Sequence, residues 1–121
     1  MSGVETAIVG GGIMGATTLW ELARAGMPAA LYESGAFGAE STGKSAAIVR
    51  MHYSNPDVVR MAVRSRAAFV SAPELLGCEP FYRRTGWVFV VDDADAEIAK
   101  ENRRMQLEQG AQSVEVPLDE L

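Results

Sequence analysis

The chain has few of the residues that build disulfides, metal sites and nucleic-acid surfaces. It contains one cysteine, Cys78, and one histidine, His52, among 121 residues. One thiol cannot form an internal disulfide, and there is no Cys/His metal spacing, so we expect no metal site and a reducing, cytoplasmic setting. The 11 Lys and Arg are outnumbered by 16 Asp and Glu, for a net charge of −5. This balance argues against nucleic-acid binding, which requires basic residues to neutralise phosphates.

Long uninterrupted apolar runs are also missing. The apolar residues between Ala7 and Ala25 are broken by glycines and by Glu21, and residues 1–5 contain no basic side chain. A spanning helix needs about 18 consecutive apolar residues, and a signal peptide needs a basic start. We therefore expect neither a membrane span nor a leader. Apolar residues still make up 48% of the chain, which is enough for the core of one compact domain.

The first 33 residues follow the pattern of a βαβ unit. Residues 6–9 are short, apolar and followed at once by glycines, as in a buried parallel strand. Residues 13–25 carry apolar side chains at helical spacing and stop at Gly26. Residues 29–32 form a second apolar run that ends at Glu33. The sequence therefore predicts an α/β fold that begins with a strand, a helix and a parallel strand.

The rest of the chain predicts one long loop, two helices and two strands. The expected elements are a loop over residues 34–47, a helix that starts at Asn55-Pro56-Asp57, a break that begins at Pro73 near Gly77, a strong strand over 87–91, a polar helix over 95–109 and a last short strand over 113–116. A long loop inside a compact domain is usually functional, so residues 34–47 are of particular interest.

Residues 10–15 match the pattern G-x-G-x-x-G between a predicted strand and a predicted helix. In this pattern Gly10 permits a tight turn, Gly12 lets the backbone approach a pyrophosphate, and Gly15 lets the helix pack close to the strand. The helix N-terminus offers free N–H groups and a partial positive charge to phosphates. Glu33 follows Gly15 by 18 residues, where a carboxylate accepts hydrogen bonds from ribose hydroxyls and disfavours the 2′-phosphate of NADP. The pattern predicts a dinucleotide site; a glycine-rich turn without a ligand is the alternative.

A second motif competes with the first. Residues 38–45, GAESTGKS, fit the P-loop pattern G-x-x-x-x-G-K-[ST], and residues 88–92 are similar to a magnesium-binding strand end. A P-loop leaves directly from a buried strand and enters a helix, whereas residues 34–37 separate Gly38 from the predicted strand. A P-loop nucleotide-binding protein that uses Gly38–Ser45 therefore stays as an alternative.

Three segments resemble the opening of the D-amino-acid oxidase superfamily of FAD-dependent oxidoreductases, in particular its sarcosine oxidase and dimethylglycine dehydrogenase branch. They are residues 7–15 (AIVGGGIMG), residues 31–33 (LYE) and residues 41–50 (STGKSAAIVR), and residues 85–90 are similar to the family's first strand of the substrate domain. The resemblance implies a Rossmann-like FAD-binding βαβ unit. It assigns residues 1–55 to the N-terminal part of the FAD-binding domain and residues 56–121 to a helix and the start of the substrate domain.

The resemblance also implies FAD as the cofactor and a small amine or amino acid as the substrate, with hydride transfer to the flavin and an imine product. The expected cofactor-binding residues, from the glycine motif and the resemblance together, are Gly10, Gly12, Ile13, Met14, Gly15, Glu33, Ser34, Ser41, Thr42, Gly43, Lys44 and Ser45. Substrate-side candidates are Arg50, His52 and Tyr53, and no catalytic base is assigned. A non-catalytic FAD-binding or dinucleotide-binding module is a further alternative.

The length of the chain raises a separate expectation. Members of the family run to several hundred residues, so the resemblance implies a fold that is incomplete by itself. A two-stranded parallel sheet with open edges buries too little surface and leaves backbone groups unpaired. We therefore expect either a natural subunit that docks onto a second chain, which supplies the rest of the flavoenzyme fold, or a fragment.

Overall fold

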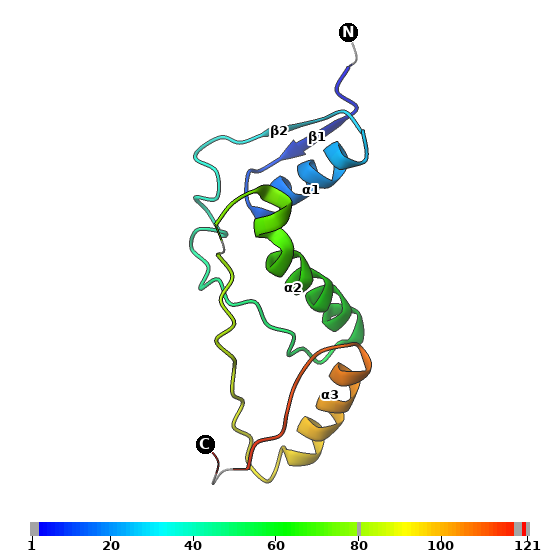
Figure 1. Cartoon of the computed structure of the whole chain (residues 1–121), viewed down its shortest axis with the longest axis vertical. Helices are drawn as coiled ribbons and strands as arrows, with labels where there is room; N and C mark the ends of the chain where they lie inside the picture. The colour runs from blue at the N-terminus through cyan, green and yellow to red at the C-terminus, as the bar shows by residue number, and fades with distance from the viewer. Residues whose placement is uncertain (1–2, 80, 118–119, 121) are drawn as a thin grey trace. The chain divides into compact units, whose positions relative to one another are not determined.

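The computed structural model describes residues 3–79, 81–117 and 120, and it divides into two compact units, residues 1–48 and 49–121. The first unit is a βαβ motif of β1 (Thr6–Val9), α1 (Ile13–Arg24) and β2 (Ala29–Tyr32), which Figure 1 shows in blue and cyan. The two strands are parallel and in register from Thr6 opposite Ala29 to Val9 opposite Tyr32. Both strands have the bounds that the sequence predicts, and α1 ends one residue earlier.

The helix α1 connects the two parallel strands and contacts both. Leu19, Trp20 and Leu22 are half-buried on it, and the Arg24 guanidinium lies 4.6 Å from the centre of the Trp20 ring. The chain reverses after the helix at Gly26, whose φ of 72° lies in the left-handed region that glycine adopts without strain. This short crossover delivers β2 beside β1, so that the carboxyl ends of both strands meet at one edge.

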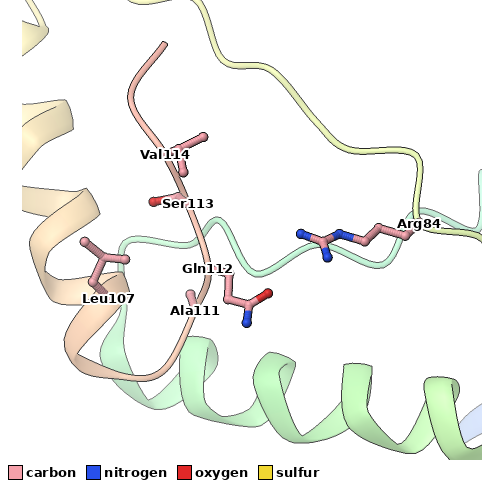
Figure 2. A pocket seen from close by; sticks show the side chains of 6 residues that line it. All are labelled: Arg84, Leu107, Ala111, Gln112, Ser113 and Val114. Carbon is pink, nitrogen blue, oxygen red and sulfur yellow. The ribbon is translucent and has the colours of Figure 1, made fainter.

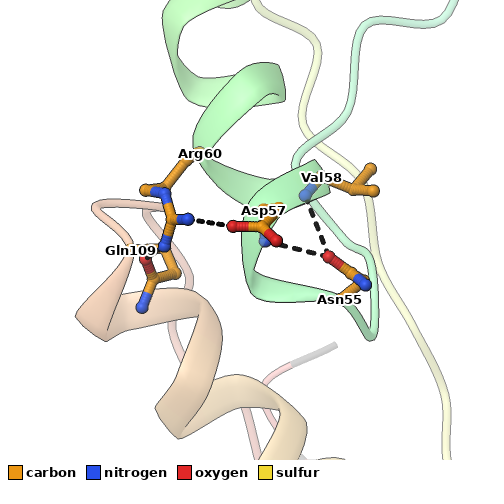
Figure 3. Close-up of polar contacts among 5 residues, drawn as sticks. All are labelled: Asn55, Asp57, Val58, Arg60 and Gln109. Carbon is orange, nitrogen blue, oxygen red and sulfur yellow. Dashed lines mark hydrogen bonds and ion pairs between the residues drawn. The ribbon is translucent and has the colours of Figure 1, made fainter.

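The second unit contains α2 (Pro56–Leu76) and α3 (Ala96–Glu108), which contact each other. Asn55 precedes α2, and its side-chain oxygen accepts hydrogen bonds from the N–H groups of Asp57 and Val58, as Figure 3 shows. Arg60 donates to the Gln109 side chain at 2.8 Å and so joins the start of α2 to the end of α3. Buried side chains of this unit include Val59, Ala72, Gln106 and Ala111.

The helix α2 ends where the sequence predicts a break, near Gly77, but Pro73 does not begin that break. The helix continues through Pro73 to Leu76 and ends at Gly77, which has a φ of 65°. Pro73 has no N–H to donate to the Phe69 carbonyl one turn earlier, but its own carbonyl accepts the N–H groups of Gly77 and Cys78 in the cap. The glycine, rather than the proline, sets the end of this helix.

The predicted strands over residues 87–91 and 113–116 were wrong, because neither segment is a strand in the structure. Both segments are fully described, and neither pairs with another strand there. The side chains of residues 87–91 are between 44% and 75% exposed, although two are aromatic and three are valine. A strand requires a neighbouring edge for its hydrogen bonds, and β-propensity alone does not supply one.

Across the ranges that the structure describes, no helix has both the length and the apolar character to cross a membrane.

The Asn55 cap yields a direct stability prediction. Replacing Asn55 by Ala removes the acceptor for two N–H groups at the start of α2, which should destabilise that helix by about 1 kcal/mol. Hydrogen exchange at the amides of Asp57 and Val58 measures the effect locally. The matched control is Ser54→Ala, one residue earlier, where no capping hydrogen bond is lost. Equal exchange rates in the two variants would contradict the capping role.

Candidate dinucleotide-binding site

The glycine loop begins directly at the carboxyl end of β1. The Gly10 N–H donates to the carbonyl of Tyr32 at 2.8 Å, and Gly10 has a φ of 103°, which residues other than glycine rarely adopt. Gly12 is the N-cap of α1. A Cβ at Gly15 would collide with the Gly10 carbonyl, so the first turn of α1 lies tightly against the loop. The geometry explains the glycines at positions 10 and 15 by backbone conformation and close packing.

Glu33 ties this loop to the residues that follow β2. One carboxylate oxygen accepts the Gly11 N–H at 2.6 Å, and the other accepts the Gly35 N–H at 2.8 Å and lies 3.4 Å from the Ser34 hydroxyl. The Gly11 N–H, followed by that of Gly35, holds the pKa of the Glu33 carboxyl below its ordinary value. The side chain therefore sits at the carboxyl ends of both strands as an anion that already binds main-chain donors.

Thr42 brings the loop over residues 34–45 back to the start of α1. Its hydroxyl accepts the Ile13 N–H at 3.0 Å, and a Cβ at Gly12 would lie 3.0 Å from the same oxygen. Gly43 is equally constrained, because a Cβ there would collide with the Gly38 carbonyl. Among the predicted cofactor-binding residues, the structure thus brings together the glycine loop, Glu33 and Thr42.

The other predicted cofactor residues of this loop make local contacts. Lys44 forms an ion pair with Glu40, and the Ser45 hydroxyl accepts the Ala47 N–H at 3.0 Å, while Ser41 is exposed. Residues 38–45, all described, form turns with neither a strand directly before them nor a helix directly after them. The GAESTGKS segment therefore lacks the strand-loop-helix context that a P-loop requires.

The start of α1 suits a pyrophosphate. Gly12 carries no side chain, the first turn of α1 contains no acidic residue, and Met14 is 76% exposed beside it. Free N–H groups and the partial positive charge at a helix N-terminus favour a bound anion, and a carboxylate in that turn would oppose one. The residues present therefore fit the phosphates of a dinucleotide, with Glu33 at the end of the neighbouring strand.

The three substrate-side candidates lie in the second unit. The Arg50 guanidinium carbon lies 5.2 Å from the centre of the Tyr53 ring, and His52 stacks on Phe89 with ring centres 3.7 Å apart. Gln106 donates to the Tyr53 carbonyl at 3.0 Å and lies 3.5 Å from Nδ1 of His52. Burial, followed by the nearby Arg50 charge, lowers the pKa of His52 below its ordinary value. These contacts favour the neutral form of His52 and hold its ring by packing.

A hollow of about 340 Å³ lies elsewhere in the second unit. Figure 2 shows Arg84 extending toward it from one segment, and the remaining lining residues are Leu107, Ala111, Gln112, Ser113 and Val114. It includes none of the predicted site residues.

Across the ranges that the structure describes, no three His, Cys, Asp or Glu side chains are grouped as metal ligands.

The sequence motif overlooked Gly11 and Phe37. Gly11 is buried although it occupies a variable position of the motif, and a Cβ there would lie 2.5 Å from Cδ1 of Phe37. The Gly11 carbonyl also accepts the Gly38 N–H at 3.0 Å. The run of three glycines, one more than the motif requires at this point, was the available signal for a close contact at Gly11.

The Glu33 geometry predicts a pH dependence. Because the pKa of Glu33 is lower in the folded chain, its ionised form stabilises the folded loop above the unfolded pKa. That contribution is lost as the pH falls through the lowered pKa. Nuclear magnetic resonance of the Glu33 carboxyl carbon, followed with the Gly11 amide, should show both changing together below the usual pH range of a glutamate. A Glu33 carboxyl with a pKa at or above the ordinary value of a glutamate would contradict the prediction. Glu40→Gln is the control variant and should leave the titration of Glu33 unchanged.

Comparison with known proteins identifies the family. The family model described as DAO, FAD dependent oxidoreductase, matches residues 5–120. The solved structure of L-proline dehydrogenase from P. horikoshii is similar, with a TM-score of 0.80 and 29% sequence identity over 88% of this chain. The chain spans 28% of the length of that protein. No curated protein matches the chain. The glycine loop, the parallel βαβ unit and the family match together show that this chain belongs to the DAO family of FAD-dependent oxidoreductases.

Proposed function

We propose that this chain is the FAD-binding portion of an oxidoreductase that oxidises a small amine or amino acid. The observation that carries the proposal is the glycine loop at the start of α1, where Gly12 is an N-cap without a side chain and Glu33 stands at the end of the neighbouring strand. The structural neighbour acts, by its title, on L-proline, a small amino acid, which supports the substrate class. When bound, FAD supplies a two-electron acceptor for oxidation of the carbon next to the substrate nitrogen.

In this proposal the residues of the first unit hold the cofactor. The N–H groups at the start of α1 receive the pyrophosphate, and Glu33 receives the ribose hydroxyls. Glu33 Oε2 accepts the Gly11 N–H and retains a further lone pair, whereas Oε1 accepts both the Gly35 N–H and the Ser34 hydroxyl, so Oε2 can bind a hydroxyl without releasing the loop. Residues 41–45 would follow the cofactor along the loop, with Thr42 at the helix start.

Arg50, His52 and Tyr53 are proposed to serve the substrate. Arg50 is exposed and carries a permanent charge that suits the carboxylate of an amino acid, and the Tyr53 ring supports its guanidinium. His52 is held by Phe89 and Gln106, which fits a positioning role better than proton transfer. Redox turnover with any of these substrates separates an enzyme from a module that binds FAD without turnover. Faster turnover of amino acids than of amines that lack a carboxylate would support the role of Arg50.

We further propose that the activity requires the remaining portion of the flavoenzyme fold, supplied as a second chain or as further sequence. The strand-like residues 87–91 have no pairing partner within the described ranges, and their apolar side chains are exposed. Arg103 Nε and Ser113 Oγ are buried and have no hydrogen-bond partner among the described residues, whereas such atoms are normally paired. The similar dehydrogenase is several times longer than the matched region.

The cofactor assignment is tested at Gly12. Gly12→Ala places a methyl group where the pyrophosphate should pass, and we expect FAD affinity to fall by more than about tenfold while the fold is kept. Flavin absorbance of the purified, assembled protein measures the bound cofactor. Gly3→Ala is the matched control, because a Cβ there meets nothing within 4 Å. Because the new methyl would also lie 3.0 Å from Thr42 Oγ1, Thr42→Ala is measured alone and with Gly12→Ala. Unchanged flavin content in Gly12→Ala would refute the assignment.

The partner proposal is tested by assembly. An obligate interface of this kind typically buries more than about 2,000 Å² in total, so we expect the isolated chain to self-associate or aggregate and to bind FAD poorly. Adding the missing portion as a separate chain should restore a soluble complex with a flavin spectrum. Size-exclusion chromatography and flavin absorbance, with and without that portion, provide the measurements. A monodisperse 121-residue monomer that binds FAD tightly by itself would contradict the proposal.

A further inference from the structure

Phe37 packs against a glycine to which the nucleotide-binding motif gives no role. A Cβ at Gly11 would lie 2.5 Å from Cδ1 and 2.8 Å from Cε1 of the Phe37 ring, so the ring occupies the space of the missing side chain. Gly11 is buried, whereas Phe37 itself is 72% exposed. A ring exposed to this degree contributes little to a core. Its close fit to Gly11 is therefore better explained by what it does to the loop.

The segment that carries Phe37 also binds both polar groups of Gly11. The Gly11 N–H donates to Glu33 at 2.6 Å, and its carbonyl accepts the Gly38 N–H at 3.0 Å. Residues 33–38 thus hold Gly11 by a carboxylate, a ring and a main-chain amide. Glycine has the greatest backbone freedom of all residues, so three contacts at this point restrict the position where the loop would otherwise be most mobile.

Gly11 lies between the two residues on which the geometry of the loop depends. Gly10 makes the left-handed turn out of β1, and Gly12 is the N-cap of α1. A rotation of the backbone at Gly11 would redirect the Gly12 N–H and the start of α1, which the proposed function assigns to the pyrophosphate. The Gly11 contacts therefore control the direction of these donors before any ligand binds.

We propose that Phe37, together with Glu33, is a positioning residue that acts through Gly11 to keep the glycine loop ready for the cofactor. The inference rests on the proposed function, since the ligand is FAD. Preorganisation of this kind raises affinity because the ordering cost is met in the free protein rather than on binding. FAD affinity should accordingly depend on a side chain that works by packing against the loop.

The first test uses the assembled protein without FAD and follows hydrogen exchange of the Gly11 amide. Phe37→Ala should increase that exchange rate by about tenfold or more, because the ring no longer closes the loop over Gly11. Phe37→Tyr keeps the ring and should restore the protection of the wild-type chain. Phe81→Ala, which removes an exposed phenylalanine of the second unit, is the matched control and should leave Gly11 unchanged. Unaltered Gly11 exchange in Phe37→Ala would overturn the proposal.

The second test measures FAD affinity of the assembled protein in a double-mutant cycle of Gly11→Ala and Phe37→Ala. Each single change should weaken binding by about tenfold, because Gly11→Ala adds a methyl group that clashes with the ring and Phe37→Ala removes the ring. The double variant should lose less than the product of the two single losses, because removing the ring relieves the clash. Losses that multiply would show independent effects and overturn the proposal. Wild-type protein that binds no FAD would overturn the proposed function instead, whereas wild-type binding with unaffected variants would overturn the role of Phe37 alone.

Discussion

The Glu33 carboxylate holds together the two loops that form the candidate site. Its position at the end of β2 follows from the parallel pairing of β1 and β2, which brings the carboxyl ends of both strands to one edge. From there it accepts one N–H group from the glycine loop and one from the turn at Gly35. A carboxylate that binds two main-chain donors is a strong hydrogen-bond acceptor, and the lowered pKa of Glu33 reflects the same interaction. Without it, the Gly11 N–H would lose its acceptor, and the Phe37 ring and the Gly38 N–H would remain as the contacts between Gly11 and residues 34–45.

A consequence is that one side chain has both a structural and a proposed ligand-binding role. Glu33 organises Gly11, Phe37 covers Gly11, and Thr42 reaches the first N–H group of α1. The proposed pyrophosphate site is therefore bordered by residues that also stabilise one another. Substitutions at these positions change the free protein as well as the complex, so measurements on the cofactor-free chain are needed to separate the two effects.

The elements that depend on local pattern could be predicted from the sequence. Residues 6–9 and 29–32 are strands with the expected bounds, because each apolar run is bounded by glycine, proline or an acid and the two pair with each other. The glycine motif, its helix and the family were also predicted, and the family model confirms the family and its dependence on FAD. The roles of the individual cofactor and substrate residues stay predictions.

The failures have separate physical causes. Residues 87–91 have the composition of a strand but meet no neighbouring edge in the described chain, and strand formation depends on that partner. The break near Gly77 was expected to begin at Pro73, yet the helix continues through the proline and ends at Gly77, which takes up the left-handed cap. Gly11 and Phe37 were overlooked because their contact is tertiary: no spacing rule connects a variable position of the motif with a residue 26 positions later.

The central claim is that the start of α1 binds the FAD pyrophosphate, and an amide titration tests it most directly. The chain, isotope-labelled and assembled with its unlabelled remaining portion, would be titrated with FAD while the amide resonances of Gly12 and Ile13 are followed. We predict that these two resonances shift strongly and saturate together with the flavin signal. FAD that binds without moving either resonance, or the absence of any binding, would contradict the claim.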